Sequence, residues 1–121
     1  MFVGVLRLRF HLLGARSLKD KRRVVLSFKD RAASRFRVSV AEVGALDDPR
    51  VATLGVAVVA NEAAHCDQVL AEVASLADRL GDALLADRSS EIIPFGPGGR
   101  GVEGGIETLP LTQEYDGVDD G

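Results

Sequence analysis

The stretch that decides the fold is FVGVLRLRF, residues 2–10 of a 121-residue chain. Its side chains fall into two alternating sets: Phe2, Gly4, Leu6, Leu8 and Phe10 in one, and Val3, Val5, Arg7 and Arg9 in the other. Successive side chains of a β-strand point to opposite faces, so this alternation predicts a strand. The first set, which carries no polar side chain, is the face expected to be buried.

A helix is expected after this strand, from about Leu18 to Arg35. Ser17 has the character of an N-cap, and Asp20 resembles the acidic member of a capping box. The apolar stripe expected to face the core is Leu18, Val25, Phe28 and Ala32.

The remaining pattern predicts strands at residues 38–43, at residues 51–60 and within residues 84–95. A second helix is expected at about residues 62–80, capped by Asn61 and stopped by Gly81. Two right-handed crossovers in this βαββαβ order give a ferredoxin-like sandwich, an α+β fold. We expect a four-stranded antiparallel sheet with both helices on one face and strands 2–10 and 51–60 at its centre.

Composition divides the chain into a domain and a tail. Residues 1–95 are expected to form the ferredoxin-like domain, and residues 96–121 a flexible, glycine-rich acidic tail. The single cysteine, Cys66, excludes an intramolecular disulfide and favours a cytoplasmic location. No apolar run approaches the ~20 residues that span a membrane, so we expect no membrane segment.

Charge is distributed unevenly along the chain. Residues 1–40 contain 11 of the 15 Lys and Arg residues but only two acids, Asp20 and Asp30. The remaining residues contain four bases and 16 acids. A basic first third in a chain of net charge −3 indicates a polyanionic partner more strongly than the total charge does.

The densest cations stand at the start of the first predicted helix. They are Lys19, Lys21, Arg22 and Arg23. The residues expected to extend the positive field are Arg7, Arg9, Arg16, Arg35 and Arg37. Phosphates are attracted to such a field, which predicts binding of RNA or another anion. The alternative is a solvated helix face without a ligand.

Lys21 interrupts the apolar stripe of this helix. Its aliphatic stem could cover the rim of the core while its ammonium reaches water. Alternatively, the ammonium has a carboxylate partner at the edge of the sheet, for which Glu42 is the candidate. Glu42 shares the parity of Val38 and Val40 in its strand, and an acid facing inward needs such a partner.

Catalytic and metal-binding patterns are weak. His65 and Cys66 are adjacent, hence about 100° apart on a helix, and cannot easily face one metal ion. The glycine cluster at residues 96–105 lacks the Lys-Ser/Thr ending of a phosphate-binding loop. We therefore expect no catalytic residues, no metal and no cofactor.

The sheet face opposite the helices is expected to be apolar and uncovered. The residues predicted to form an interface there are Val3, Val5, Val43, Ala57 and Val59. A large exposed apolar surface indicates a partner, most simply a second copy of the chain. Stacking of RNA bases on this face is not expected, because it lacks suitable aromatic residues.

Four segments together resemble the bacterial YlxP family, a small domain of unknown function. They are Phe2–Val5, Ser17–Arg22, Val38–Val43 and Thr53–Ala57. The resemblance covers about residues 1–95 and implies a ferredoxin-like fold and, because members are often encoded beside ribosome-maturation genes, a link to RNA or the ribosome. It carries over no catalytic residues. Residues 45–48 read Ala-Leu-Asp-Asp, where members more often have His, Gln and an aromatic residue.

The sequence therefore predicts a non-enzymatic protein that binds RNA or a ribosomal particle through a basic helix edge. The alternative is a protein-interaction module, dimeric through the sheet, with no role in nucleic-acid binding. An enzyme that uses Lys21 and Glu42 is a more distant third possibility.

Overall fold

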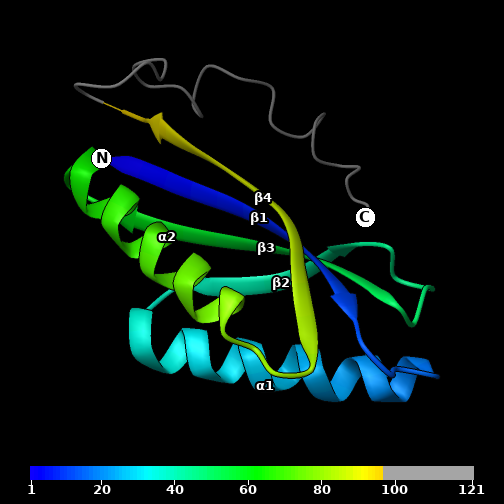
Figure 1. Ribbon diagram of the computed structural model, residues 1–121. Coiled ribbons are helices and arrows are strands. Elements are labelled where there is room, and N and C mark those ends of the chain that lie inside the picture. The colour runs from blue at the N-terminus through cyan, green and yellow to red at the C-terminus, as the bar shows by residue number, and fades with distance from the viewer. Residues whose placement is uncertain (97–121) are drawn as a thin grey trace, which may run out of the picture.

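The structure is a computed structural model in which residues 1–96 are described, and its elements follow the expected βαββαβ order (Figure 1). The strands are β1 (Phe2–Leu12), β2 (Ser39–Gly44), β3 (Val51–Ala60) and β4 (Ala83–Pro94). The helices are α1 (Leu18–Phe36) and α2 (Ala63–Asp78). The expected acidic tail lies outside the described residues, apart from Gly96.

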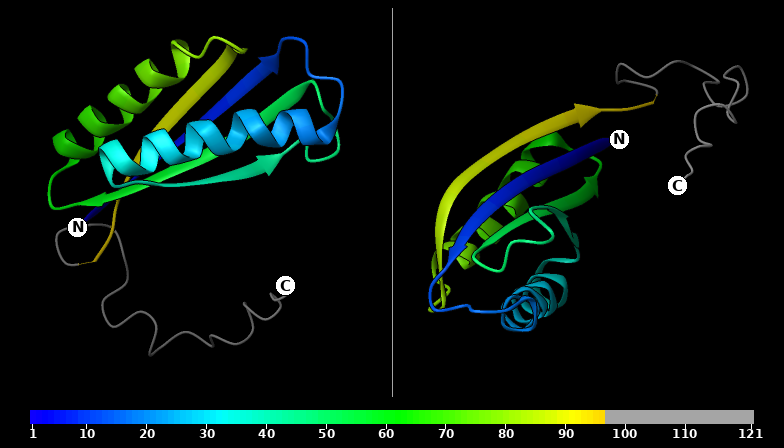
Figure 2. Two further views of the ribbon diagram at one scale, coloured as in Figure 1. Left: turned by 90° about the horizontal axis from the view of Figure 1, so that it is seen from below. Right: turned by 90° about the vertical axis from the view of Figure 1, so that its right-hand side faces the viewer.

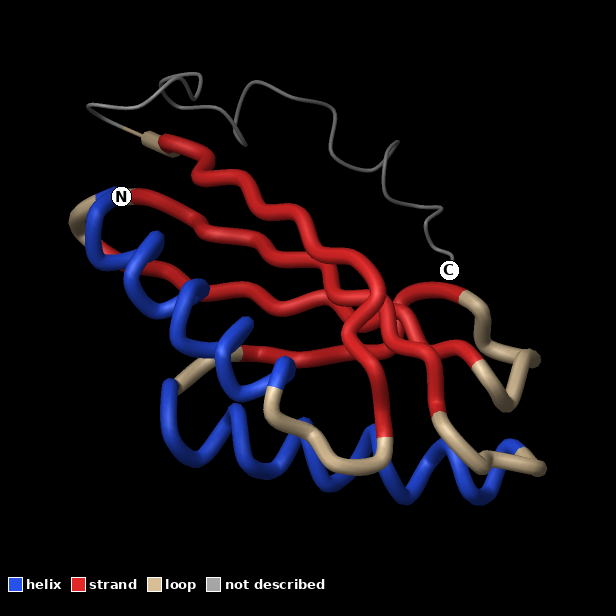
Figure 3. Tube along the Cα trace, in the orientation of Figure 1, coloured by secondary structure: helices blue, strands red, loops and turns tan. Residues whose placement is uncertain are grey.

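The four strands form one antiparallel sheet in the order β2-β3-β1-β4, so β1 and β3 are central, as predicted. Both helices lie on the same face of the sheet, and the opposite face carries no helix from the described residues (Figures 2 and 3). The predicted α+β ferredoxin-like fold is confirmed.

The core fills the space between the sheet and the helices. Leu6, Leu8, Phe10 and Leu12 of β1 are buried, and so are the even-numbered residues 52–58 of β3. Of the four apolar residues predicted to face the core from α1, Val25, Phe28 and Ala32 are buried against them. Leu18, the fourth, is only half-buried. The rings of Phe10 and Phe28 meet edge to face, with centroids 5.8 Å apart. The alternation read in residues 2–10 therefore identified the buried face of the central strand.

The ends of α2 differ from the prediction. Glu62, not Asn61, is the N-cap residue, and it makes no side-chain capping bond. The helix ends at Asp78, because the N–H groups of Arg79 and Leu80 donate to Leu76 and Ala77 three residues earlier. These hydrogen bonds between residues three apart form a tighter final turn than an α-helical one. Gly81 does not act as a left-handed C-cap, since its φ is not positive.

Lys21 is buried among the apolar residues of α1, with 2% of its surface exposed. Its Nζ lies 2.8 Å from Oε2 of Glu42 on β2. It also donates to the carbonyl oxygens of Ala45 at 2.7 Å, Val51 at 3.1 Å and Leu46 at 3.3 Å. The expectation that the ammonium reaches water is therefore wrong, and the alternative pairing with Glu42 is confirmed.

The contacts of Lys21 explain the shape of the connection between β2 and β3. Ala45 has a φ of 55°, a left-handed conformation that costs a residue with a Cβ atom about 1–2 kcal/mol. The carbonyls of this connection converge on the ammonium, and these charge-assisted hydrogen bonds offset that cost. Glu42 Oε2 is buried and has no other polar partner among residues 1–96.

Replacing Lys21 with Met should strongly destabilise the fold. The Lys21→Met variant keeps the stem but leaves the Glu42 carboxylate without its cation and removes a donor that three carbonyls share. The free energy of unfolding should therefore fall by about 3–5 kcal/mol. Urea unfolding followed by circular dichroism measures this change.

Lys19→Met is the matched control, because Lys19 is exposed on the same helix. It should change the free energy of unfolding by no more than about 0.5 kcal/mol. The double variant Lys21→Met with Glu42→Leu should recover part of the loss, since it also removes the orphaned charge. Equal stability of Lys21→Met and the wild type would contradict this role.

Candidate functional site

A row of cations runs along the exposed surface of α1. Lys19, Arg23, Arg31 and Arg35 are spaced by multiples of four residues, with Ser27 completing the row, and all five are exposed. Residues four apart lie nearly one above another on a helix, so these side chains form a continuous ridge. We call these five residues the cation ridge.

The cation ridge and the buried stripe occupy different sides of the same helix. Lys21 and Val25 point into the core, so the side chains two residues before and after them in the sequence, Lys19, Arg23 and Ser27, project toward solvent. Arg35 also has its guanidinium carbon 5.2 Å from the centroid of the Phe36 ring, which orients the last cation of the ridge.

Of the other predicted binding residues near the start of α1, two are exposed and one is buried. Arg22 is exposed on α1, on the flank of the ridge, and Arg16 is exposed in the connection before the helix. Lys21 is not available to an external anion in this structure, because its ammonium is buried and fully occupied. The start of α1 thus supplies Lys19, Arg22 and Arg23 to a binding surface, but not Lys21.

Arg7 and Arg9 lie on the opposite side of the sheet from the helices. They alternate along β1 with the buried Leu6, Leu8 and Phe10. Their side chains therefore project into solvent from the helix-free face. In the β1–β4 pairing Arg7 is opposite Ser89 and Arg9 is opposite Asp87. The structure therefore separates these two arginines from the cation ridge.

The first turn of α1 is fixed by its own polar residues. The N–H of Asp20 donates to Ser17 Oγ at 3.1 Å, which confirms Ser17 as the N-cap. The N–H of Arg16 donates to Asp20 Oδ2 at 3.0 Å, so the predicted capping box closes one residue earlier than its usual form. This hydrogen bond, helped by the Arg23 charge, holds the pKa of Asp20 below its ordinary value of 3.8.

A hollow of about 520 Å³ borders the middle of the cation ridge. It lies between α1, the connection that precedes α1 and the connection between α2 and β4. Arg23, Ser27 and Arg31 contribute to its wall, together with Asp20 and Asp82. We call it the loop hollow.

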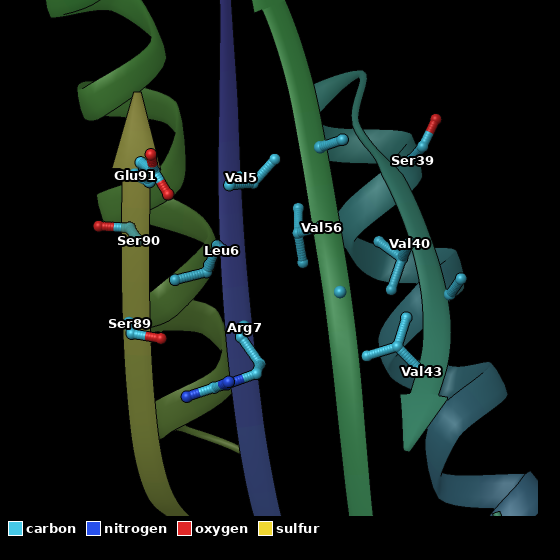
Figure 4. A pocket seen from close by; sticks show the side chains of 13 residues that line it. Val5, Leu6, Arg7, Ser39, Val40, Val43, Val56, Ser89, Ser90 and Glu91 are labelled. Carbon is cyan, nitrogen blue, oxygen red and sulfur yellow. The ribbon is translucent and has the colours of Figure 1, made fainter. Parts of the chain in front are cut away.

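A second hollow, of about 560 Å³, lies on the helix-free face of the sheet (Figure 4). Residues of all four strands line it, including Val5, Arg7, Val43, Ala57 and Glu91. We call it the sheet hollow. Val43 shares the side of β2 that carries Ser39 and Ala41, and the β2–β3 pairing is irregular at this position, between Glu42 and Gly44. A Cβ added to Gly55 would lie 3.1 Å from Val43, so this glycine makes room for the valine side chain.

The predicted interface residues lie around the sheet hollow. Val3, Val5, Ala57 and Val59 are neighbours on β1 and β3, because Val3 pairs with Val59 and Val5 pairs with Ala57. Val43 and Val59 are among the exposed large apolar residues. The structure thus brings all five predicted interface residues to the helix-free face.

Sequence reasoning found the start of the cation ridge and its last cation, Arg35, but missed Arg31 and the loop hollow. The spacing of Arg31 from Arg23 and Arg35 was the available signal for the missing cation. The hollow had no such signal, because its wall comes from three segments between residues 12 and 82.

Two further observations bear on the chemistry of residues 1–96. In this part of the chain, no three His, Cys, Asp or Glu side chains gather in a way that could hold a metal ion. Neither of the two helices described has the length and apolar character needed to cross a lipid bilayer.

Comparison with known proteins identifies a family. A family profile described as "Protein of unknown function (DUF503)" matches residues 3–89, from β1 into β4. No curated protein matches the chain.

The lowered pKa of Asp20 predicts a pH-dependent contribution to stability. A carboxyl group whose pKa is lower in the folded state stabilises the fold above its unfolded pKa, and this contribution is lost as the pH falls through the folded value. Asp20→Asn should therefore be less stable than the wild type at neutral pH, and the difference should shrink below pH 3.8.

Urea unfolding at about pH 7 and about pH 3 measures this difference, since the first pH lies above the ordinary carboxyl pKa of 3.8 and the second lies below it. Asp30→Asn is the control, because it removes the same charge from the same helix without touching the first turn. A difference between Asp20→Asn and the wild type that is equal at both pH values would show that the charge of Asp20 is not responsible.

Proposed function

We propose that this chain, a member of the DUF503 family of proteins of unknown function, binds RNA. This is the family that the YlxP resemblance indicated. The RNA, free or within a ribosome-associated particle, contacts the cation ridge and the basic residues beside it. The role is one of binding rather than catalysis, and its setting is the cytoplasm.

The observation that carries this proposal is the surface of α1. Besides Lys21, the helix has six cations, Lys19, Arg22, Arg23, Lys29, Arg31 and Arg35, against two acids, Asp20 and Asp30. Within residues 1–96 only Arg23 of the six contacts an acid, Asp20, and that distance is 3.9 Å. Five cations of one helix thus have no acidic partner within the described residues, which leaves them to an external anion.

This arrangement is unfavourable for the helix by itself. Lys19 and Arg23, and again Arg31 and Arg35, are like charges four residues apart, and each such pair costs about 0.2–0.5 kcal/mol. The cations of the first turn also oppose the helix dipole. A phosphate backbone that follows the ridge relieves both effects and releases counterions, which favours binding at low salt.

A second proposal concerns the sheet hollow, and its occupant is a second copy of the chain. The hollow combines apolar residues with one cation, Arg7, and one anion, Glu91, and neither forms an ion pair within residues 1–96. In a two-fold symmetric contact, each surface meets its own image. Such a contact can bring Arg7 of one copy to Glu91 of the other while the apolar residues cover each other.

Removing charge from the cation ridge should weaken RNA binding and its salt dependence. The triple variant Lys19→Gln, Arg23→Gln, Arg31→Gln loses three phosphate contacts. The slope of log affinity against log salt should therefore become shallower by roughly two, at ~0.7 for each contact with a single strand. Fluorescence anisotropy of a labelled single-stranded RNA between ~50 and ~200 mM salt measures both quantities.

The matched control is Arg50→Gln, Arg79→Gln, Arg88→Gln, which removes three exposed cations outside α1. It should weaken binding much less, because these side chains do not lie on the ridge. Equal losses in the two triple variants would show that only total charge matters. Absence of RNA binding by the wild type at any salt concentration would refute the proposed function.

Introducing a charge into the sheet hollow should prevent dimer formation. Ala57 lies between Val5 and Ser39 in neighbouring strands, so Ala57→Asp places a carboxylate in the middle of the apolar contact. Light scattering after size-exclusion chromatography should give a dimer for the wild type and a monomer for the variant. The exposed Ala33→Asp substitution on α1 is the control and should remain dimeric. A wild type that is monomeric at about 100 μM, a concentration well above the micromolar affinities of ordinary interfaces, would overturn this proposal.

A further inference from the structure

We infer that the loop hollow holds one ribonucleotide of a bound RNA strand, with its phosphate at Arg31 and its ribose 2′-hydroxyl at Asp82. This inference rests on the proposed RNA binding and adds to it a defined subsite. It also predicts a preference for RNA over DNA, which a ridge of cations does not provide by itself.

The hollow is held in shape by a contact between two connections of the chain. The N–H of Leu13, just after β1, donates to the carbonyl of Asp82, just before β4, at 3.1 Å. Gly14 follows with a φ of 80°, a left-handed conformation that suits glycine, as the chain turns toward α1. The two connections lie at the same end of the molecule, beside the first half of α1 (Figure 2).

The polar groups of the hollow differ in whether they are already occupied. Asp20 accepts the Arg16 N–H and lies near Arg23. By contrast, the side chains of Ser27, Arg31 and Asp82 make no hydrogen bond or ion pair with any part of residues 1–96. Around the same hollow, Ser27 therefore offers a hydroxyl, Arg31 a cation and Asp82 a carboxylate, and none of the three is paired within residues 1–96.

This set of groups favours a ligand that carries both an anion and a hydroxyl donor. A simple anion would pair with Arg31 but would be repelled by Asp82. A nucleotide satisfies both groups, because its phosphate accepts from guanidinium and its ribose hydroxyls donate to carboxylate. Carboxylates bind ribose 2′-hydroxyls in this way in dinucleotide-binding folds.

The apolar part of the wall suits the rest of the nucleotide. Leu13 is 62% exposed at the hollow, and Val24 and Leu80 are half-buried beside it. An exposed leucine at the mouth of a polar hollow gives a sugar or base an apolar surface to cover. The volume of about 520 Å³ lies within the range of about 300–1,000 Å³ that is usual for small-molecule sites.

DNA lacks the group that Asp82 would recognise. The 2′-hydroxyl is the feature by which proteins distinguish RNA from DNA at a given position. Phosphate contacts along the cation ridge are the same for both nucleic acids. Discrimination should therefore depend on Asp82, whereas overall affinity should depend on Arg31 and the other cations.

The test compares the affinities of the full chain for a single-stranded RNA and a DNA of the same sequence, each fluorescein-labelled, by anisotropy at low salt. The wild type should bind the RNA roughly five-fold more tightly, the ratio expected from one ordinary hydrogen bond. Asp82→Ala should bring this ratio close to one. Arg31→Gln should weaken binding of both nucleic acids and leave the ratio above one.

Asp67→Ala is the matched control, because it removes an exposed acid that does not line the loop hollow. It should change the two affinities alike and keep the wild-type ratio. A wild type that binds RNA and DNA equally, or an Asp82→Ala variant that keeps the preference, would overturn the ribose site while leaving RNA binding by the ridge intact. Binding of neither nucleic acid by the wild type would instead refute the proposed function itself.

Discussion

The buried ammonium of Lys21 is the interaction on which the rest of this structure depends. It joins three parts of the chain: α1, which carries it, β2, which supplies Glu42, and the connection to β3, which supplies three carbonyls. A buried charge is tolerated only when its partners are all in place, because its desolvation costs several kcal/mol. Lys21 therefore fixes the rotation of α1 against the edge of the sheet. Since the cation ridge lies on another side of the same helix, this rotation also determines where the ridge points.

The segment Ser17–Arg23 combines two kinds of residue. Ser17, Asp20 and Lys21 are occupied by contacts within the chain, at the helix cap and under the sheet edge. Lys19 and Arg22 make no ion pair within residues 1–96, and Arg23 makes one long contact. Part of this segment thus serves folding, whereas binding, as we propose it, uses the residues between the structural ones. The two groups point in different directions from the helix, because neighbouring residues differ by about 100° around its axis.

The two surfaces for which we propose partners lie on opposite sides of the sheet. The cation ridge and the loop hollow belong to the helix layer, and the sheet hollow belongs to the helix-free face. Figures 1 and 2 show these two sides of the sheet. A dimer formed through the sheet would leave both copies of α1 at the outside of the assembly. RNA binding and dimerisation are therefore compatible, and a dimer would present two ridges to one long polyanion, which raises avidity.

The sequence by itself determined the order of the elements, the buried face of β1 and the basic character of α1, because these follow from local periodicity and from charges close together in the chain. It also predicted which residues would share the helix-free face, since strand parity fixes this. It left open whether Lys21 reaches water or pairs with Glu42, and it placed Arg7 and Arg9 in one field with the start of α1. Only the tertiary structure decided these points. Packing between segments far apart in the chain buries Lys21 and puts the sheet between Arg7, Arg9 and the cation ridge. The same packing brings Arg31 and Asp82 to one hollow. No local sequence pattern contains this information.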